Sequence, residues 1–394
     1  MRVDFLFLSF FKRFRWQPSS VTCGDTFPQG KVFVVRIVIT CVNRYQSPPH
    51  PKTTMKRIVS LFLTLLMLTT LIACSAPKEE GGANALPETT TYPITLTDAA
   101  GRSVVIEDEP LSLVSGYYIS TSAVIALELD TRMVGIEAKA DKRPIYKRAA
   151  PDLIALPSVG TAKEFDLEGC AALAPDLVIL PLKLKDAAAS LEALGIDALL
   201  VNPEDEAGLR EMISLIASAM NCGKRANELL SFMDKTEDDL ASRLSGVDAP
   251  KVYLAGNSDF LSTAGDGMYQ SSLISRAGGV NAAAEITDTY WANVSYEQIL
   301  AWNPDYIILA SDASYTVDDV LADANLAGVS AIANGNVYQM PGDAEAWDSP
   351  VPSAVLGSVW LAGVLHPDKM TDADVMATAD SFYETFYGFT YREN

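Results

Sequence analysis

One short phrase occurs twice in this chain. The sequence LEGCAALAPDLVIL, residues 167–180, is matched by YEQILAWNPDYIIL, residues 296–309, and equivalent positions lie 129 residues apart throughout. In each copy a Pro-Asp pair stops a helical stretch, and the apolar residues that follow are typical of a buried strand. A helix–strand unit present in two copies predicts two related α/β lobes.

Apolar strands and helices alternate along most of the chain. Runs such as DLVILP, DALLVN and KVYLAG are continuously apolar, which is typical of parallel sheets covered on both faces. Residues 204–245 are helical almost throughout, with a break at Cys222-Gly223. We therefore predict an α/β fold of two Rossmann-like lobes with parallel sheets, joined by a long rigid helix, with a ligand cleft between the lobes. The predicted boundaries are 93–215 for the N-terminal lobe, 216–246 for the connecting helix and 247–394 for the C-terminal lobe.

The first 74 residues differ in composition from the rest. They hold ten Lys or Arg and two Asp or Glu, whereas the formal net charge of the whole chain is −20. From Met55 a short basic start precedes an uncharged run that is typical of a secretory signal core and short for a membrane span. We predict a leader over 1–54 with the true start at Met55, a signal peptide over 55–73, and a lipid anchor and flexible tether over 74–92. A membrane segment within 1–54 is the alternative.

The signal core ends in LIAC, which resembles the bacterial lipobox. The resemblance implies that Cys74 is lipidated, so that the protein is exported and held by its lipid on the outer face of the cytoplasmic membrane or in the periplasm. The acidic remainder of the chain disfavours binding to nucleic acid or to anionic membranes by bulk electrostatics. A disulfide between Cys170 and Cys222 is one possibility, although the apolar helical context of each cysteine favours a free thiol.

Signatures of catalysis are scarce. Beyond the leader the only histidine is His366, which disfavours a metal site made of several imidazoles. There is no Gly-x-Ser-x-Gly motif, no P-loop and no complete dinucleotide fingerprint. We predict that the protein is not an enzyme and has no cofactor.

Aromatic residues gather where strands end. Tyr117 and Tyr118 follow the first strand of the N-terminal lobe, Tyr290 and Trp291 precede the second copy of the repeated phrase, and Trp347 lies in a loop before the final helices. Ligands of open α/β sheets bind beyond the carboxyl ends of the strands. We predict that these five side chains contact a ligand; the alternative is that they cover the edges of the core.

Several phrases in order resemble one family. ITLTDAAGRSVVIEDEP, LPSVGTAKEFDLEGCAALAPDLVI, STAGDGMYQSSLISRAGGVNAAAE and VSYEQILAWNPDYIILAS are similar to the substrate-binding proteins of ABC importers, in the group that takes up iron–siderophore complexes, haem and cobalamin. The resemblance implies a monomeric lipoprotein that captures a metal chelate, foremost an iron–siderophore complex, and delivers it to an ABC permease dimer with its ATPase. Cobalamin, haem or an oxyanion such as molybdate are alternative ligands, and a two-lobed enzyme is a remote alternative.

The resemblance also assigns roles to residues. Glu168 and Glu297, each near the start of its copy of the repeated helix, are implied to dock onto basic pockets of the two permease subunits. The chain departs from the family at Lys163, where other members have a small or aromatic residue, and its last loop lacks an Arg that siderophore binders often have. Lys163 and Lys183 are then the cationic candidates for an anionic ligand, with solvated lysine as the alternative.

Overall fold

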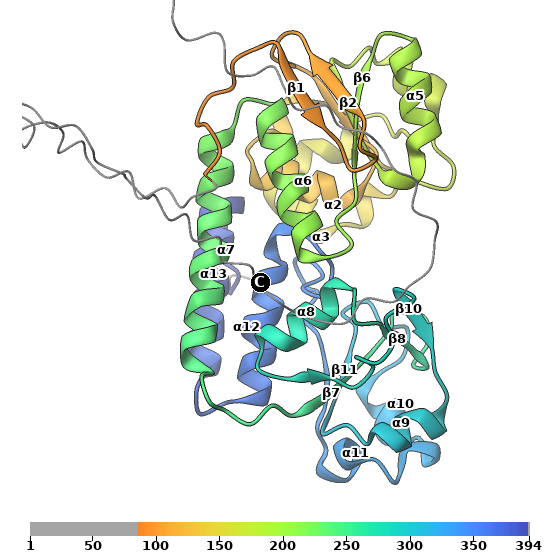
Figure 1. Ribbon diagram of the computed structural model, residues 1–394, viewed down its shortest axis with the longest axis vertical. Coiled ribbons are helices and arrows are strands. Elements are labelled where there is room, and N and C mark those ends of the chain that lie inside the picture. The colour runs from red at the N-terminus through yellow and green to blue at the C-terminus, as the bar shows by residue number, and fades with distance from the viewer. Residues whose placement is uncertain (1–84, 393–394) are drawn as a thin grey trace, which may run out of the picture. The chain divides into compact units, whose positions relative to one another are not determined.

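The computed structural model describes residues 85–392, which belong to one compact unit (Figure 1). The predictions made for residues 1–84, including lipidation at Cys74, lie outside the described residues. Among the helices described, none is long and apolar enough to cross a membrane.

The N-terminal lobe is built on a parallel sheet of four strands in the order β4-β3-β5-β6. The strands are short and apolar, as predicted: β3 (Leu113–Ser115), β4 (Met133–Ile136), β5 (Leu177–Pro181) and β6 (Asp197–Val201). The helices of this lobe are α2 (Tyr118–Ala126), α3 (Pro144–Ala149), α4 (Leu167–Ala172), α5 (Lys185–Ala193) and α6 (Glu206–Ala219). Because β3 has β4 on one side and β5 on the other, the strand order reverses at β3, and ligands of such sheets bind beyond that point.

An antiparallel hairpin precedes this sheet. It consists of β1 (Ile94–Thr97) and β2 (Ser103–Ile106), which pair along their whole length. Gly101 lies in the turn at φ +72°, a conformation that glycine adopts without steric cost. The two strand-like runs around this glycine are thus confirmed as a hairpin.

The C-terminal lobe has a mixed sheet in the order β10-β8-β7-β11-β12, with β9 also beside β7. Its strands are β7 (Lys251–Ala255), β8 (Ser262–Ala264), β9 (Val280–Asn281), β10 (Trp291–Asn293), β11 (Tyr306–Leu309) and β12 (Val337–Gln339). Its shorter helices are α8 (Tyr269–Arg276), α9 (Tyr296–Trp302), α10 (Val317–Leu321) and α11 (Ser330–Asn334). The two-lobed α/β prediction is confirmed; the difference is that β8 and β10 run antiparallel at one edge.

The repeated phrase folds into the same unit twice. The pairs α4–β5 and α9–β11 start at equivalent residues, and between helix and strand Ala174 and Asn303 both take a left-handed conformation, with φ of 46° and 45°. The aspartate of each Pro-Asp pair then binds the start of the neighbouring strand: Asp176 accepts from the backbone N–H groups of Leu111 and Ser112, and Asp305 from that of Lys251. The phrase recurs because each lobe needs the same connection between a helix and a central strand.

Three long helices connect the two lobes. The long helix α7 spans Gly223–Arg243, shorter than the predicted 216–246 because the chain turns at Asn221 (φ 57°). It does not act alone, since α12 (Val355–Leu365) packs against α7, and α13 (Asp372–Tyr387) packs against both α12 and α2 of the N-terminal lobe (Figure 1). Phe232 of α7 meets two phenylalanine rings of α13 at 5.3 and 5.7 Å between centroids. The predicted connecting helix is thus α7, and the structure adds that α12 and α13 pack beside it at the junction of the lobes.

A cluster of charges ties the lobes together beside α7. Arg276 of α8, in the C-terminal lobe, forms ion pairs with Glu206 of α6 and with Glu237 of α7. Arg210 of α6 contacts the same two carboxylates at 2.9 Å each. Burial, together with the neighbouring Glu206, raises the pKa of Glu237 to about 7. The cluster adds polar contacts to an already packed junction.

The predicted tether is not free over its last residues. The Leu86 backbone exchanges two hydrogen bonds with the Asn227 side chain on α7, and the Tyr92 hydroxyl donates to the carbonyl of Ala219 at 2.7 Å. Residues 85–92 are therefore fixed along α6 and α7, which corrects the prediction of a flexible segment reaching residue 92. Cys170 and Cys222 are both free thiols, the favoured of the two alternatives.

Candidate ligand cleft

The strand ends of the two lobes meet around Tyr118. This residue begins α2 directly after β3, and its surroundings include Asp312, Asp348 and Ser349 of the C-terminal lobe. Ser311, which follows β11, donates to Asp348 from its backbone N–H at 3.3 Å and from its hydroxyl at 2.6 Å. Burial raises the pKa of Tyr118. Residues beyond strand ends of both lobes thus contribute to one place, as the fold class predicts.

Arg143 is the cation at this place. Its guanidinium carbon lies 4.0 Å above the centre of the Tyr118 ring. Within residues 85–392 it makes no ion pair with a carboxylate, whereas Arg102, Arg210 and Arg276 all do. Arg143, which lies in the loop after β4, was not among the residues predicted from the sequence. Its position beyond a strand end is the signal in the sequence that points to it.

Buried carboxyl groups stand on both sides of Arg143. In the N-terminal lobe, Glu137 follows β4 and accepts hydrogen bonds from the hydroxyls of Tyr146 and Thr121 at 2.6 and 2.7 Å. In the C-terminal lobe, Glu345 binds the Ser353 hydroxyl through Oε2, while its Oε1 has no hydrogen-bond partner among the described residues. Burial raises the pKa of both glutamates, and Arg143 acts on both in the opposite direction. The chain has 50 Asp and Glu residues, and nothing in the sequence distinguished Glu137 and Glu345 from the others.

Tyr117 and Lys183 come together, as two of the predicted ligand contacts should. They line a pocket of about 70 Å³ at the carboxyl ends of β5 and β6, with Glu204 opposite. This volume is far below the roughly 300–1,000 Å³ of ordinary small-molecule sites. The pocket by itself therefore suits water or a small part of a ligand.

Lys163 stands apart from this pocket. It is exposed in the tight turn between Gly160 and Phe165, just before α4. Its backbone N–H donates to the hydroxyl of Thr161, and Lys163 does not line the pocket that holds Lys183. The two predicted lysines thus do not form one cationic site.

Tyr290 and Trp291 lie on the surface of the C-terminal lobe. Their side chains are 50% and 41% exposed, which is unusual for aromatic residues of this size. A Cβ added to Gly256, the residue after β7, would come within 3.1 Å of the Trp291 ring. Trp291 therefore covers a strand end at the carboxyl edge of its sheet, where it can contact a ligand.

Trp347 does not reach a ligand. Its side chain is fully buried, its ring lies 5.0 Å from that of Tyr391, and its indole N–H donates to the Tyr383 hydroxyl at 3.0 Å. The prediction of a ligand contact for Trp347 is wrong, because the loop before α12 folds inward and buries the indole in the core shared with α13.

Glu168 and Glu297 occupy equivalent positions. Each is the second residue of its helix, behind an N-cap formed by Asp166 or Ser295, and each is exposed. Because each helix leads into the amino end of the next strand, its own start lies at the carboxyl edge of the sheet, the edge beyond which ligands of such sheets bind. A hydrogen bond from Ser295 lowers the pKa of Glu297, which keeps that carboxylate charged at neutral pH.

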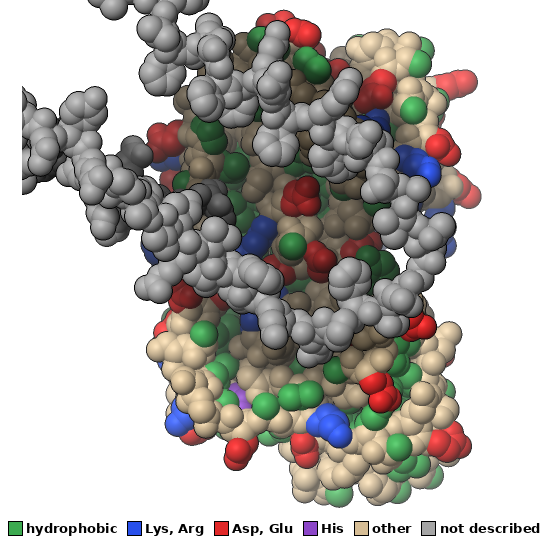
Figure 2. Space-filling view, in the orientation of Figure 1, with side chains coloured by type: hydrophobic (Ala, Val, Ile, Leu, Met, Phe, Trp, Pro, Cys, Tyr) green, Lys and Arg blue, Asp and Glu red, His purple; other side chains and the backbone are tan. Residues whose placement is uncertain are grey.

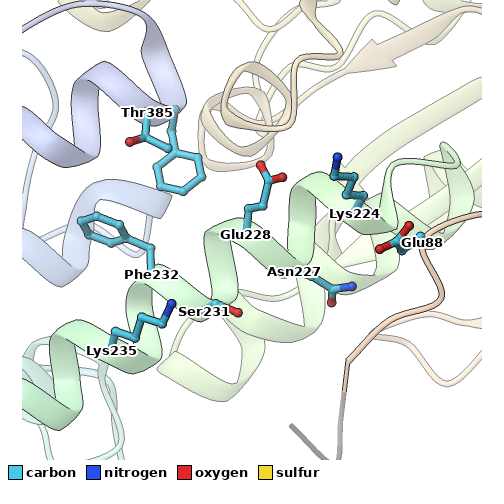
Figure 3. A pocket seen from close by; sticks show the side chains of 9 residues that line it. Glu88, Lys224, Asn227, Glu228, Ser231, Phe232, Lys235 and Thr385 are labelled. Atoms are coloured by element: carbon cyan, nitrogen blue, oxygen red, sulfur yellow. The ribbon is translucent and has the colours of Figure 1, made fainter. Parts of the chain in front are cut away.

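A larger cavity lies elsewhere. A hollow of about 490 Å³ lies between α7 and α13 and is lined by Glu88, Lys224, Asn227, Glu228, Ser231, Phe232, Lys235, Thr385 and Phe386. Figure 3 shows the side chains that line it. It is remote from the strand ends and mixes charges of both signs. On the face of the molecule that Figure 1 presents, Asp and Glu side chains are spread over the parts not covered by grey atoms (Figure 2). In residues 85–392 no group of three or more His, Cys, Asp and Glu could hold a metal ion.

Comparisons with known proteins agree with this architecture. The periplasmic binding protein family matches residues 113–344, more than half of the chain. The molybdate-binding protein MolA of Haemophilus influenzae is 29% identical over 76% of this chain and 89% of its own length. The substrate-binding lipoprotein YvrC of Bacillus subtilis, an uncharacterised ABC transporter component, is 26% identical over 81% of this chain and all of its own.

A solved structure extends the likeness to three dimensions. The structure of MolA bound to molybdate superposes with a TM-score of 0.68 at 27% identity and covers 76% of this chain and 99% of MolA. The chain belongs to the periplasmic binding protein family and is a solute-binding protein, not an enzyme, of the kind that serves ABC importers.

Proposed function

We propose that this protein captures a small oxyanion of the molybdate type in the cleft between its lobes and delivers it to an ABC permease. The observation that carries the proposal is Arg143, a cation held over Tyr118 at the junction of both sheets without an ion pair among the described residues. A guanidinium offers a planar fork of N–H donors that matches the oxygens of an anion. The similarity to MolA supports the same class of ligand.

An iron–siderophore complex, the ligand first expected from the sequence, is the second candidate. The exposed rings of Tyr290 and Trp291 favour it, because aromatic faces at a rim suit a larger ligand with apolar surface. An anionic chelate would use the same Arg143. The two candidates therefore differ in the side chains that they need besides the arginine.

Ligand binding can be tested on a chain that starts at Ser75, which contains the whole compact unit. Molybdate, tungstate, sulfate, a ferric siderophore, haem and cobalamin are added in turn, and the melting temperature and tryptophan fluorescence are recorded. Since a ligand that binds only the folded state stabilises it, we expect molybdate to raise the melting temperature, by an amount that grows with its concentration.

Variants separate the two candidates. Arg143→Ala should abolish the molybdate response and Arg143→Lys should retain part of it. The matched control is Lys147→Ala, at an exposed position on α3, the helix that follows Arg143. Loss of a siderophore response in Trp291→Ala, with no response to molybdate, would instead select the iron complex. Molybdate binding that survives in Arg143→Ala would contradict the proposed site.

We propose that Glu168 and Glu297 dock the protein onto the permease. Two exposed carboxylates at matched positions on the two lobes suit a two-fold symmetric partner with arginine-lined pockets. Charge reversal of both residues to Arg should abolish uptake by cells while ligand binding stays unchanged. Reversal of the exposed Glu211 on α6 is the control, and equal uptake by the double variant would reject these contacts.

Lipidation of Cys74 is part of the same proposal. The LIAC sequence and the similarity to a substrate-binding lipoprotein support it. Cells fed a labelled fatty acid should incorporate the label into the protein, and Cys74→Ser should not carry it. A labelled Cys74→Ser protein would contradict the assignment.

A further inference from the structure

We propose that two buried glutamates, Glu137 from the N-terminal lobe and Glu345 from the C-terminal lobe, set the charge of the cleft around Arg143, so that an anion binds together with protons. This inference rests on the proposed function and specifies how the same site selects its ligand. Its consequence is a preference for anions that strengthens as the pH falls.

Helix α2 places both carboxyl groups beside the arginine. Tyr118, Thr121 and Ser122 lie on the first turns of α2: Tyr118 carries Arg143 above its ring, and the Thr121 hydroxyl donates to Glu137 at 2.7 Å. The Tyr387 hydroxyl lies 3.4 Å both from the carbonyl of Ser122 and from Oε2 of Glu345. One turn of helix therefore connects the cation to a carboxyl group of each lobe.

The Glu345 carboxyl is poorly suited to a negative charge. It is 7% exposed, and its Oε1 is buried without a hydrogen-bond partner among the described residues. A carboxylate with one unsolvated oxygen is costly in a protein interior, whereas a protonated carboxyl loses less on burial. Protonation of Glu345 also leaves its hydrogen bond with Ser353 possible.

Every element packed around the two glutamates contributes to their titration. Glu137 faces Tyr146 and Arg143 at α3 and Thr121 on α2. Glu345 faces Ser122 on α2, Ser353 before α12, Tyr387 on α13, and Arg143. A third buried carboxyl, Asp348, also acts on Tyr118 and accepts a hydrogen bond from Ser311, next to Asp312. Burial raises the pKa of Glu137, Glu345 and Asp348.

The sign of the pH effect follows from the net charge. With both glutamates ionised, two negative charges near Arg143 oppose an anion. Protonation of both removes these two charges and makes the site more positive by two, whatever the charge on Asp348. An anion therefore raises the affinity of these carboxyls for protons, and protons raise the affinity for the anion by the same factor. Each carboxyl whose protonation is coupled to anion binding can change the anion affinity by at most about tenfold per pH unit.

The test measures molybdate affinity by calorimetry between about pH 5.5 and pH 8.5, outside the range in which an ordinary glutamate titrates. We expect the affinity to rise severalfold per pH unit as the pH falls. Glu345→Gln, which mimics the protonated carboxyl, should bind more tightly than the wild type at high pH and show a flatter profile. Glu137→Gln should act in the same direction, and Glu211→Gln should leave the profile unchanged.

A second measurement does not depend on how the variants fold. In two buffers of different ionisation enthalpy, the wild-type binding enthalpy should differ by an amount that reports net proton uptake. No proton uptake, or an affinity that does not change with pH, would overturn the inference and leave the proposed function standing. A folded protein that binds no oxyanion at any pH would overturn both.

Discussion

The two copies of the helix–strand unit are alike in backbone and different in what surrounds them. Both start at equivalent residues and turn through a left-handed residue. In both, an aspartate then accepts hydrogen bonds from the backbone at the start of the neighbouring strand in the sheet. At the strand ends the N-terminal lobe contributes Tyr118 and Arg143, whereas the C-terminal lobe contributes an exposed Trp291 and a buried Trp347. The repeated unit supports the sheets, whereas the non-repeated loops carry the residues of the proposed ligand site.

This difference explains why repetition was a good guide to fold and a poor guide to the ligand site. A connection between helix and strand has few stable solutions, so both lobes kept the same one. A loop beyond a strand end is free to vary, and here each lobe varied separately. The predictions below test how far the two lobes are equivalent.

The largest expected effect separates the two tryptophans of the C-terminal lobe. Trp347→Ala should lower the free energy of unfolding by about 3–5 kcal/mol, because it empties a fully buried site and removes the hydrogen bond to Tyr383. Trp291→Ala, at a side chain that is 41% exposed, should cost less than about 1 kcal/mol. Urea denaturation followed by circular dichroism measures both, and equal losses would mean that the two indoles do not differ in burial.

The second test compares the two capping aspartates. The Asp176 carboxylate accepts from two backbone N–H groups and the Ser112 hydroxyl, whereas Asp305 accepts from one N–H, that of Lys251. We expect Asp176→Ala to destabilise the protein by about 2 kcal/mol and Asp305→Ala by about 1 kcal/mol. A larger loss at Asp305 in the same denaturation series would contradict this order.

The contribution of Asp176 should also depend on pH. Partial burial acts to raise the pKa of Asp176, but the hydrogen bonds from Ser112 and Leu111 outweigh burial and leave this pKa below its usual value. A group whose folded-state pKa is lowered contributes stability above its unfolded pKa, and this is lost as the pH falls through the folded value. The difference in melting temperature between wild type and Asp176→Ala should therefore be full at neutral pH and shrink in acid; a constant difference would argue against an ionised cap.

The smallest effect concerns the two left-handed residues. Ala174 has no side-chain reason to adopt φ 46°, so Ala174→Gly should stabilise the protein by about 0.5–1 kcal/mol after the entropic cost of glycine. Asn303 tolerates the same conformation, and its side-chain oxygen accepts from the backbone N–H of Ser330 at 2.8 Å. Asn303→Gly should therefore destabilise by about 1 kcal/mol. Melting temperatures that move in the same direction in both variants would show that the two turns are equivalent.

Much of the fold was predictable from local patterns, and the exceptions share a cause. Continuous apolar runs identified β5, β6, β7 and β11, and the break at Cys222 separated α6 from α7. The edge strands β8 and β10 have three residues each, and α3 has six, which is too short for a periodic signal. Such elements form because neighbours already present hydrogen-bonding edges and apolar surface.

The sequence by itself determined the two lobes, their connection by a long helix, and the matched positions of Glu168 and Glu297, because each of these depends on residues close together in the chain. It also identified Tyr117, Tyr118 and Trp291 as residues at strand ends. Only the tertiary structure decided that Arg143 lies over Tyr118, that Glu345 is buried next to it, and that Trp347 belongs to the core. These relations join residues that are distant in sequence, and the packing of α2, α12 and α13 between the lobes fixes them.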